Sequence, residues 1–373
     1  MSSSADERAG KMGAEGGGCA EAKDATSAGG RSDVLVGEVR TGLLANSRAL
    51  TEPEATAVVA LSPGSQVRVS ARPVPHAVSP GLTLGVHCPV PSASGTRRDG
   101  LGTVLSRASL TSGRLVQAST HARIVLGGRG SVIEGRRPWA HHLVHPGTIE
   151  VVGRLPADDL ADGFLLTATG DGPGVVLDLG AVCGRLLDQV QESPILDQKL
   201  PFRARRTRFR FVLLPCRHTA AGESFHHSSA GDSDTTSGSS RAPGHVCRVD
   251  FVVADETVRT LRMHGSGLSL VDVVGLCEDF ALHDWLLTTV QHVVAGSRVR
   301  AGGGGRLPSQ LKPVIDHLLH VWMPAARVGE ELLPVWVGLE QRAGFSRQWE
   351  SLVGWIRDQL SLSLLAVLGD GAR

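Results

Sequence analysis

The chain has 373 residues, of which 41% are hydrophobic, and it carries 38 basic and 37 acidic side chains for a formal net charge of +1. Such a balanced charge gives no general positive field to attract nucleic acid or an anionic membrane, so neither is expected as a partner. No stretch of 18 apolar residues is present, and the sequence therefore predicts no transmembrane helix. The length suits two ordinary domains or one large one.

The cysteines are dispersed along the chain, and no two of them form a C-x-x-C motif. A chain of this size can fold without disulfides, so we expect reduced thiols in a cytoplasmic protein. The N-terminus is rich in Ser, Ala and Gly without an apolar segment, so no secretory signal is expected. The cysteines concerned are Cys19, Cys88, Cys183, Cys216, Cys247 and Cys277.

The first structured elements are expected after a long polar N-terminus. Residues 1–33 are small and polar, which predicts a disordered tail because so few apolar side chains cannot offset the entropy of ordering. Alternating apolar residues from Val34 predict the first strand. Thr51 followed by Pro53 is typical of a helix start, with a hydroxyl cap and a proline in the first turn. We expect this short helix to end near Leu61.

A β-rich stretch follows. From Ser65 to about Leu155 the sequence alternates between apolar and polar residues with Gly and Pro between the runs, which predicts several strands. The tripeptide at 111–113 indicates a hairpin turn between two of these strands. A helix is then predicted at about 178–192, and the alternation of residues 206–215 predicts another strand.

The predicted sheet is interrupted and then resumes. Residues 217–245 are of low complexity, which predicts a long mobile loop inside one domain. Beyond this loop, residues 245–255 and 257–265 predict an antiparallel pair of strands.

From Gly267 onward the apolar period becomes helical. Strands first and helices afterwards predict an α+β fold rather than alternating β-α-β units. We expect a disordered tail at 1–33, a β-rich region with antiparallel strands at 34–266, and a C-terminal helical bundle at 267–373. The helices are predicted at about 269–295, 309–322, 330–342 and 346–368.

Two predicted helices of the bundle each carry an Asp four residues before a His, a spacing that puts both side chains on one helix face. The pairs are Asp279 with His283 and Asp316 with His320. An antiparallel hairpin of these helices would bring the two imidazoles level with each other. They could then form a metal or acid/base site, with each Asp orienting its own His. Alternatively each His is a packed side chain satisfied by its neighbouring carboxylate. We favour this second interpretation and expect no tightly bound metal, since structural zinc takes four ligands.

A second group of histidines is a weaker metal candidate. His141 and His145 would share a face if the residues after Pro138 form a helical turn. Pro146 follows at once, however, so such a helix could barely complete one turn. The sequence has no phosphate-binding loop, nucleophile elbow, zinc-protease helix or dinucleotide fingerprint. We therefore expect no cofactor.

Five arginines lie within eight residues between Arg203 and Arg210. Such a strand could bind phosphates through bidentate guanidinium contacts, which makes an anionic-ligand or nucleic-acid binder a weaker alternative. The competing interpretation has two parts, namely that the strand face is solvated and that its arginines pair with acids of neighbouring segments.

Tryptophan is concentrated near the C-terminus, where five of the six fall within about seventy residues. Most should be buried, since Trp usually is. We expect Trp336 and Trp355 to be the least internal and to form an apolar surface for a partner, because aromatic residues are enriched at binding hot spots.

Several motifs resemble one family. In these motifs the chain resembles an uncharacterised family of streptomycete and related actinobacterial proteins. That family is known by a locus name and has no assigned activity. Members of that family start near GEVRT, so the first 33 residues resemble an added tail or a misassigned start. The resemblance covers roughly residues 37–370. The motifs are GEVRTGLL (37–44), PWAHHL (138–143), CEDFALHDWLLTT (277–289), DHLLHVWMP (316–324) and IRDQL (356–360).

The resemblance implies a role in a multi-protein system, since the genes of that family accompany genes for a P-loop protein and a methyltransferase-like protein. It supplies no catalytic residues. The function we expect first is a non-catalytic interaction or accessory subunit whose partners are other proteins of the same system. An enzyme that uses the Asp/His pairs is the alternative. The sequence predicts no oligomeric state.

Overall fold

The computed structural model describes residues 32–62, 64, 66–126, 137–166, 177–216, 244–300 and 307–370. The predicted tail at 1–33 lies outside these residues except for its last two positions, and so does almost all of the predicted loop at 217–245.

The described strands form one ten-stranded mixed sheet in the order β2-β3-β5-β7-β6-β1-β8-β10-β9, with β4 pairing with β5. Most pairs are antiparallel, but β8 runs parallel to β10 and β7 parallel to β6. The fold class is therefore α+β, as predicted, with two parallel pairs that alternation alone does not reveal. The strands are β1 Ser32–Leu43, β2 Arg68–Ser70, β3 His76–Val78, β4 Leu82–Val90, β5 Arg98–Thr111, β6 Leu115–Leu126, β7 Thr148–Val151, β8 Thr207–Pro215, β9 His245–Val253 and β10 Val258–Ser266.

The β5–β6 hairpin confirms the predicted turn. Ser112 and Gly113 connect the strands with φ angles of 54° and 60°. Two consecutive residues in the left-handed region are typical of the tight hairpin turn that matches strand twist. From Leu105 outward the two strands separate, and β7 pairs with both of them at the open end.

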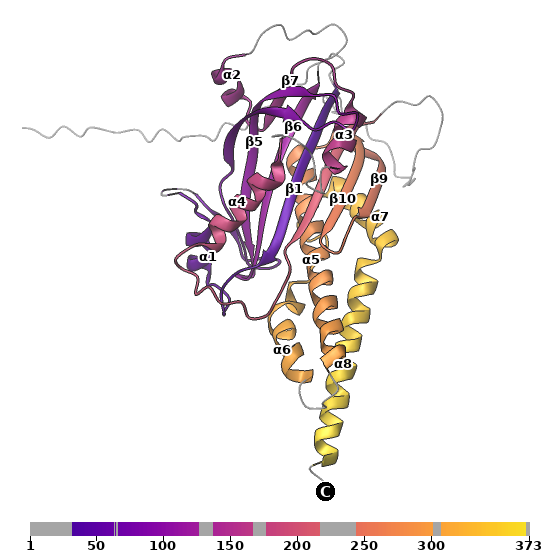
Figure 1. Cartoon of the computed structure of the whole chain (residues 1–373). Helices are drawn as coiled ribbons and strands as arrows, with labels where there is room; N and C mark the ends of the chain where they lie inside the picture. Colours follow the sequence, from indigo (N-terminus) through magenta and orange to yellow (C-terminus); the bar gives the residue numbers. More distant parts are fainter. Residues whose placement is uncertain are drawn as a thin grey trace, which may run out of the picture. The chain divides into compact units, whose positions relative to one another are not determined.

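The helices lie on both sides of the sheet (Figure 1). Helix α1 begins as predicted, with Thr51 as its N-cap and the backbone N–H of Thr51 donating to the Glu54 carboxylate at 2.9 Å. Helix α3 was not predicted. The helices are α1 Glu52–Val59, α2 Trp139–Val144, α3 Ala157–Leu166, α4 Leu179–Gln191, α5 Leu270–Arg300, α6 Leu307–His317, α7 Leu333–Ala343 and α8 Phe345–Asp370, with 3-10 turns at Leu319–Val321 and Glu330–Leu332.

Strand β1 shows how the two faces of the sheet are covered. Leu35 and Val39 point to one face and pack with Phe280 and other residues of α5. Val34 belongs to the opposite face and packs with Leu160 of α3. The two-residue period of a strand thus divides the apolar side chains of β1 between two cores. Helix α4 packs across β6 and β1.

The residues from Arg31 to Arg373 form a single compact unit. Helix α5 packs on β1 and β8, while α6 and α8 pack on α5. The predicted boundary at 266/267 therefore separates strands from helices inside one unit. Among the described helices, none has the length and apolar character needed to cross a membrane.

The prediction of reduced thiols is wrong for one pair, because Cys216 and Cys247 form a disulfide with a Cα–Cα distance of 6.6 Å. Sheet register explains their proximity. Pro215 at the end of β8 and Val246 at the start of β9 both pair with Gly265 of β10. The local pattern of the sequence does not predict this pairing, since the two cysteines are 31 residues apart.

Candidate functional site

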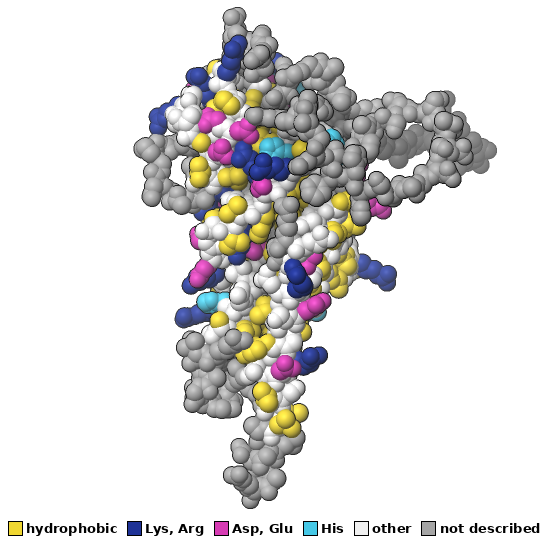
Figure 2. Space-filling model, turned by 90° about the vertical axis from the view of Figure 1, so that its right-hand side faces the viewer, with side chains coloured by type: hydrophobic (Ala, Val, Ile, Leu, Met, Phe, Trp, Pro, Cys, Tyr) yellow, Lys and Arg dark blue, Asp and Glu magenta, His cyan; other side chains and the backbone are white. Residues whose placement is uncertain are grey.

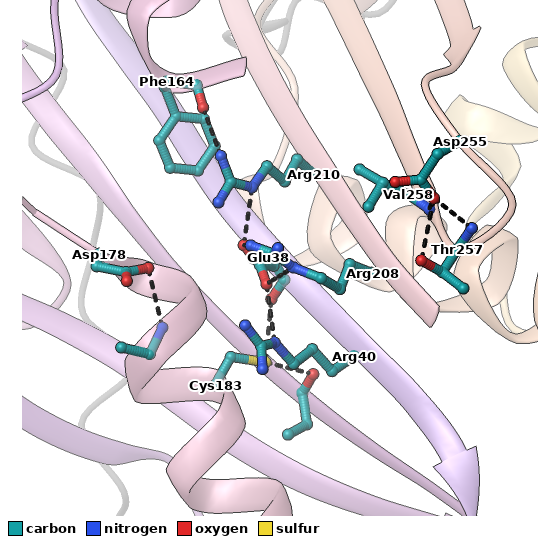
Figure 3. A network of polar contacts seen from close by, with 12 residues as sticks. Glu38, Arg40, Phe164, Asp178, Cys183, Arg208, Arg210, Asp255, Thr257 and Val258 are labelled. Atoms are coloured by element: carbon teal, nitrogen blue, oxygen red, sulfur yellow. Dashed lines mark hydrogen bonds and ion pairs between the residues drawn. The ribbon is translucent and has the colours of Figure 1, made fainter. Parts of the chain in front are cut away.

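A buried carboxylate with three arginines lies on the face of the sheet covered by α3 and α4 (Figure 3). Glu38 of β1 is fully buried and accepts hydrogen bonds from the Nε atoms of Arg40 at 2.9 Å, Arg208 at 3.0 Å and Arg210 at 2.9 Å. The strand register brings them together, because Arg210 and Arg208 of β8 lie opposite Glu38 and Arg40. We call these four residues the Glu38 cluster.

The Glu38 cluster holds more positive than negative charge. Burial alone would raise the pKa of Glu38, but the hydrogen bond from Arg208 and the charges of the three arginines hold the pKa below its ordinary value. Arg210 is further fixed by a hydrogen bond to the Phe164 carbonyl at 3.0 Å, and its guanidinium lies 5.5 Å from the centre of the Phe164 ring. Glu38 is therefore ionised at neutral pH and orients the guanidinium groups around it.

Glycines on α4 allow the helix to approach this cluster. A Cβ atom at Gly180 would lie 2.6 Å from Oε2 of Glu38, and one at Gly184 would lie 2.6 Å from Nη1 of Arg40. Between them, Cys183 places its sulfur 3.0 Å from the Ala118 carbonyl of β6. The small side chains of α4 thus fit a helix that packs directly over charged groups.

A second polar cluster lies on the opposite face, under α5. Arg107 of β5 makes a bidentate pair with Glu278 of α5, at 2.7 and 2.6 Å. Ser119 of β6 donates to the same carboxylate at 2.5 Å, and Gln117 donates to the Glu278 carbonyl at 2.9 Å. We call Arg107, Gln117, Ser119 and Glu278 the Glu278 cluster. It joins the first third of α5 to two strands.

Two histidines border the Glu278 cluster. Burial, together with nearby arginine charge, lowers the pKa of His76 and of His121 to about 4 each. The Nδ1 atom of His121 is buried and has no hydrogen-bond partner within the described part of the chain. Arg107 holds the pKa of Glu278 below its ordinary value despite burial. At neutral pH the two histidines are therefore neutral, and Glu278 is an ionised carboxylate that is a weak base. This arrangement is suited to packing and hydrogen bonding.

The pair of Asp279 and His283 lies in the core beside this cluster. The two side chains are 3.4 Å apart and each is 1% exposed. The Nδ1 atom of His283 lies 2.7 Å from the Asp279 carbonyl, and its ring packs edge-on against Trp322 and Trp336. Asp279 also accepts a hydrogen bond from the backbone N–H of Ala325 at 3.1 Å. Here the Asp does lie beside its own His, as the spacing predicts.

The second pair does not form. Helix α6 ends at His317, and His320 lies in the following 3-10 turn, so the Asp316–His320 spacing does not continue on one helix face. His320 is exposed and bonds through Nε2 to the Ser112 hydroxyl at 2.9 Å. Asp316 pairs with Lys312 at 2.7 Å. The prediction that the rings of His283 and His320 face each other is therefore wrong.

The other predicted metal candidates do lie close together. The rings of His141 on α2 and of His145, the residue that caps its C-terminus, are 4.7 Å apart, and His141 lies 3.3 Å from Glu150. Within the described ranges, however, no group of three or more His, Cys, Asp or Glu side chains has an arrangement that could hold a metal ion.

The arginines from 203 to 210 divide between different surroundings. Arg205 pairs with Glu256, Arg206 with Asp188, and Arg208 and Arg210 with Glu38. Arg203 is exposed. Four of the five thus meet acids of neighbouring segments, as one of the two interpretations predicts, but the face is not solvated as that interpretation also expects, because Arg210 and Glu38 are buried.

The tryptophans differ from the expectation in part. Trp336 is 4% exposed and stacks on Phe280 with ring centres 4.1 Å apart, so it belongs to the core and cannot form a partner surface. Trp355 is partly buried and packs against the same core.

Sequence reasoning missed the two charged clusters as sites. A signal was present, because Glu38 has the strand parity of Val34 and Val36 and a charge at such a position must find a buried partner. The chain is thus an α+β protein with helices on both faces of its sheet. One cluster of ion pairs lies on each face, between the sheet and the helices that cover it. Comparisons with protein-family models, curated proteins and solved structures found no match.

Proposed function

We propose that this chain is a non-catalytic interaction subunit of an actinobacterial multi-protein system, and that it docks another protein of that system through the end of helix α8. The proposal is carried by one observation, a group of exposed leucines on α8. We define Leu362, Leu364 and Leu365 as the α8 patch.

One member of the α8 patch, Leu364, continues a helix face that is otherwise covered, whereas Leu362 and Leu365, three residues apart, lie on the other side of the helix. Trp349 and Ile356 of α8 are buried at 6% and 2% exposure, and Leu360 packs partly on the same core. Leu364, four residues further along the same face, is 62% exposed. Its neighbours Leu362 and Leu365 are 59% and 64% exposed. Figure 2 shows hydrophobic side chains at the surface near the lower end of the described part of the molecule.

Three exposed leucines within four residues favour a docking surface. Burying one leucine fully is worth about 1.5–3 kcal/mol, so the patch offers several kcal/mol to a partner that covers it. Single exposed leucines are ordinary, but three of them within four residues of one helix leave apolar surface on more than one side of the helix end, which a partner that wraps around it can cover. The resemblance described above supplies the partner class, namely the products of the neighbouring P-loop and methyltransferase-like genes.

The enzyme alternative receives less support. It depends on His283 and His320 acting together, whereas one is buried between tryptophans and the other is exposed beside Ser112. A cytoplasmic location is part of our proposal, and the Cys216–Cys247 pair tests it, because disulfides persist mainly in oxidising compartments. The disulfide of the structure speaks against that location, and thiol trapping in intact cells decides the point, since an oxidised pair there would contradict the cytoplasmic part of the proposal.

The test is capture of the two neighbouring gene products by the full chain. A triple variant with Leu362, Leu364 and Leu365 replaced by Ser should lose at least tenfold in affinity and keep its melting temperature. The matched control replaces three exposed leucines on other elements, Leu143→Ser, Leu166→Ser and Leu200→Ser, which are 64%, 68% and 50% exposed. The control should bind like the wild type.

Two outcomes would contradict the proposal. Equal capture by both triple variants would show that the α8 patch is not the docking surface. Light scattering that finds a wild-type dimer, lost only in the α8 variant, would assign the patch to a second copy of this chain instead of a different protein.

A further inference from the structure

A surface cavity of about 290 Å³ lies beside the second half of α5, away from the α8 patch and from both polar clusters. Its walls come from the segment before β8, from the β9–β10 turn and β10, and from α5. The residues that line it are Arg203, Ala204, Arg205, Glu256, Arg259, Thr288, Thr289, Gln291, His292 and Ala295.

One arginine of the cavity is held rigidly. Arg259 donates through Nε to Asp284 at 2.9 Å, and both side chains are less than 10% exposed. Its Nη1 donates to the carbonyls of Asp255 and Val258, and its Nη2 lies 3.3 Å from the Thr288 hydroxyl. A guanidinium fixed on several sides loses little conformational freedom when a ligand binds.

The entrance of the cavity carries two more guanidinium groups. Arg205 pairs with Glu256 at an exposed position, with side chains 58% and 79% exposed. Arg203 is exposed, and its side chain makes no hydrogen bond or ion pair with the described residues. Three arginines thus face two carboxylates, Glu256 at the entrance and Asp284 behind Arg259. The cavity therefore has one positive charge in excess. Thr288 and Thr289 also line it, and their hydroxyl groups can act as further hydrogen-bond donors.

We propose that this cavity binds a small ligand through an oxyanion, either a phosphate or a carboxylate, with Arg203 and Arg259 as the main donors. The planar guanidinium of Arg203 can donate two parallel hydrogen bonds to either group, whereas Arg259, whose Nε and Nη1 atoms are already engaged, has one Nη2 N–H left to donate. The volume is close to the lower end of the range for small-molecule sites. A nucleic-acid polymer fits less well, because the whole chain has a net charge of only +1 and the entrance itself carries Glu256.

The experiment is calorimetric titration of the full-length protein with inorganic pyrophosphate and, separately, with succinate, at low ionic strength. One of the two should bind with one-to-one stoichiometry, and the arm that binds identifies the oxyanion. Arg203→Gln should weaken binding at least tenfold, and Thr288→Val several-fold. Arg206→Gln makes the same charge change three residues away, at a residue paired with Asp188 outside the cavity, and should stay within twofold of the wild type.

Arg203 is exposed and makes no ion pair with any residue that the structure describes, so its replacement should leave the circular dichroism spectrum and melting temperature unchanged. Absence of binding by the folded wild type in both arms would overturn the proposal. Equal weakening by Arg203→Gln and Arg206→Gln would also overturn it, because the anion would then respond to general charge and not to the cavity.

Discussion

Glu38 of β1 and Arg210 of β8 are cross-strand partners whose ion pair is closed to solvent, with Nε and Oε2 2.9 Å apart and side chains 0% and 5% exposed. Two central strands of the sheet are thus joined by a buried charge pair in addition to their backbone hydrogen bonds. Removing one partner of such a pair leaves an uncompensated buried charge, which costs far more than the pair contributes when intact.

Glu38→Gln should therefore destabilise the fold by about 3–5 kcal/mol, since it leaves the guanidinium groups of Arg210, Arg208 and Arg40 without their shared carboxylate. Urea denaturation followed by circular dichroism measures the change. Glu256→Gln removes a carboxylate from an exposed pair and should cost less than about 1 kcal/mol. A loss below 1 kcal/mol for both variants would show that the Glu38 cluster is not a fixed charge network.

Two glycines in helices should respond to alanine in opposite directions. At Gly180 a Cβ would lie 2.6 Å from the Glu38 carboxylate, so Gly180→Ala should lower the free energy of unfolding by about 1–3 kcal/mol. At Gly354 of α8 a Cβ meets nothing within 4 Å, so Gly354→Ala should raise it by about 0.5–1 kcal/mol through helix propensity. Thermal and urea unfolding of the two variants measure both signs. Stabilisation by Gly180→Ala would mean that α4 does not pack over Glu38.

Stability should fall between pH 6.5 and pH 4.5 because of two half-buried histidines. The pKa of His121 and of His76 is lowered from 6.5 to about 4 in the folded chain, so below pH 6.5 the unfolded chain binds protons that the folded chain does not. Each such group lowers the free energy of unfolding by at most about 1.4 kcal/mol per pH unit in this window, and this stabilisation is fully present above pH 6.5.

Urea titrations at pH 7.0 and pH 5.0 measure this loss. His121→Gln should reduce the difference between the two pH values by about 2 kcal/mol, whatever its effect at pH 7.0. His87→Gln removes an exposed histidine and serves as the control, which should leave the difference as in the wild type. An unchanged difference in His121→Gln would show that the ring of His121 is accessible to protons in the folded state.

Local pattern was sufficient for much of this fold. The two-residue period predicted β1, the β5–β6 hairpin and the β9–β10 pair, and the helical period placed α5, α7 and α8 within a few residues of their observed start points. Helix α3 was not predicted because its sequence, ADDLADGFLL, is short and contains Gly163, and glycine has a low helix propensity.

The local sequence pattern did not predict which residues meet in long-range contacts. Arg107 and Glu278 are 171 residues apart, and their contact depends on which strands are neighbours in the sheet and where α5 crosses them. The Cys216–Cys247 pair depends on the shared partner Gly265 in the same way. Charge at an inward strand position indicates that a buried partner exists, but not which residue it is.

The last prediction separates two histidines that the sequence presents as equivalent. His283 is 1% exposed between Trp322 and Trp336 and lies 3.4 Å from the buried Asp279 carboxylate. His283→Ala removes the imidazole that packs against that carboxylate and leaves space beside two indole rings. We expect a loss of about 1–3 kcal/mol in the free energy of unfolding, measured by urea denaturation.

His320→Ala should cost less than about 1 kcal/mol, because His320 is exposed and gives up a single hydrogen bond to the hydroxyl of Ser112. The double variant should equal the sum of the two single variants within about 0.5 kcal/mol, as expected for side chains that do not touch. Elemental analysis of protein purified without added metal provides the decisive contrast. Stoichiometric zinc, manganese or iron that disappears in the double variant, together with strongly non-additive stabilities, would show that the two histidines share a site and would favour the enzyme alternative.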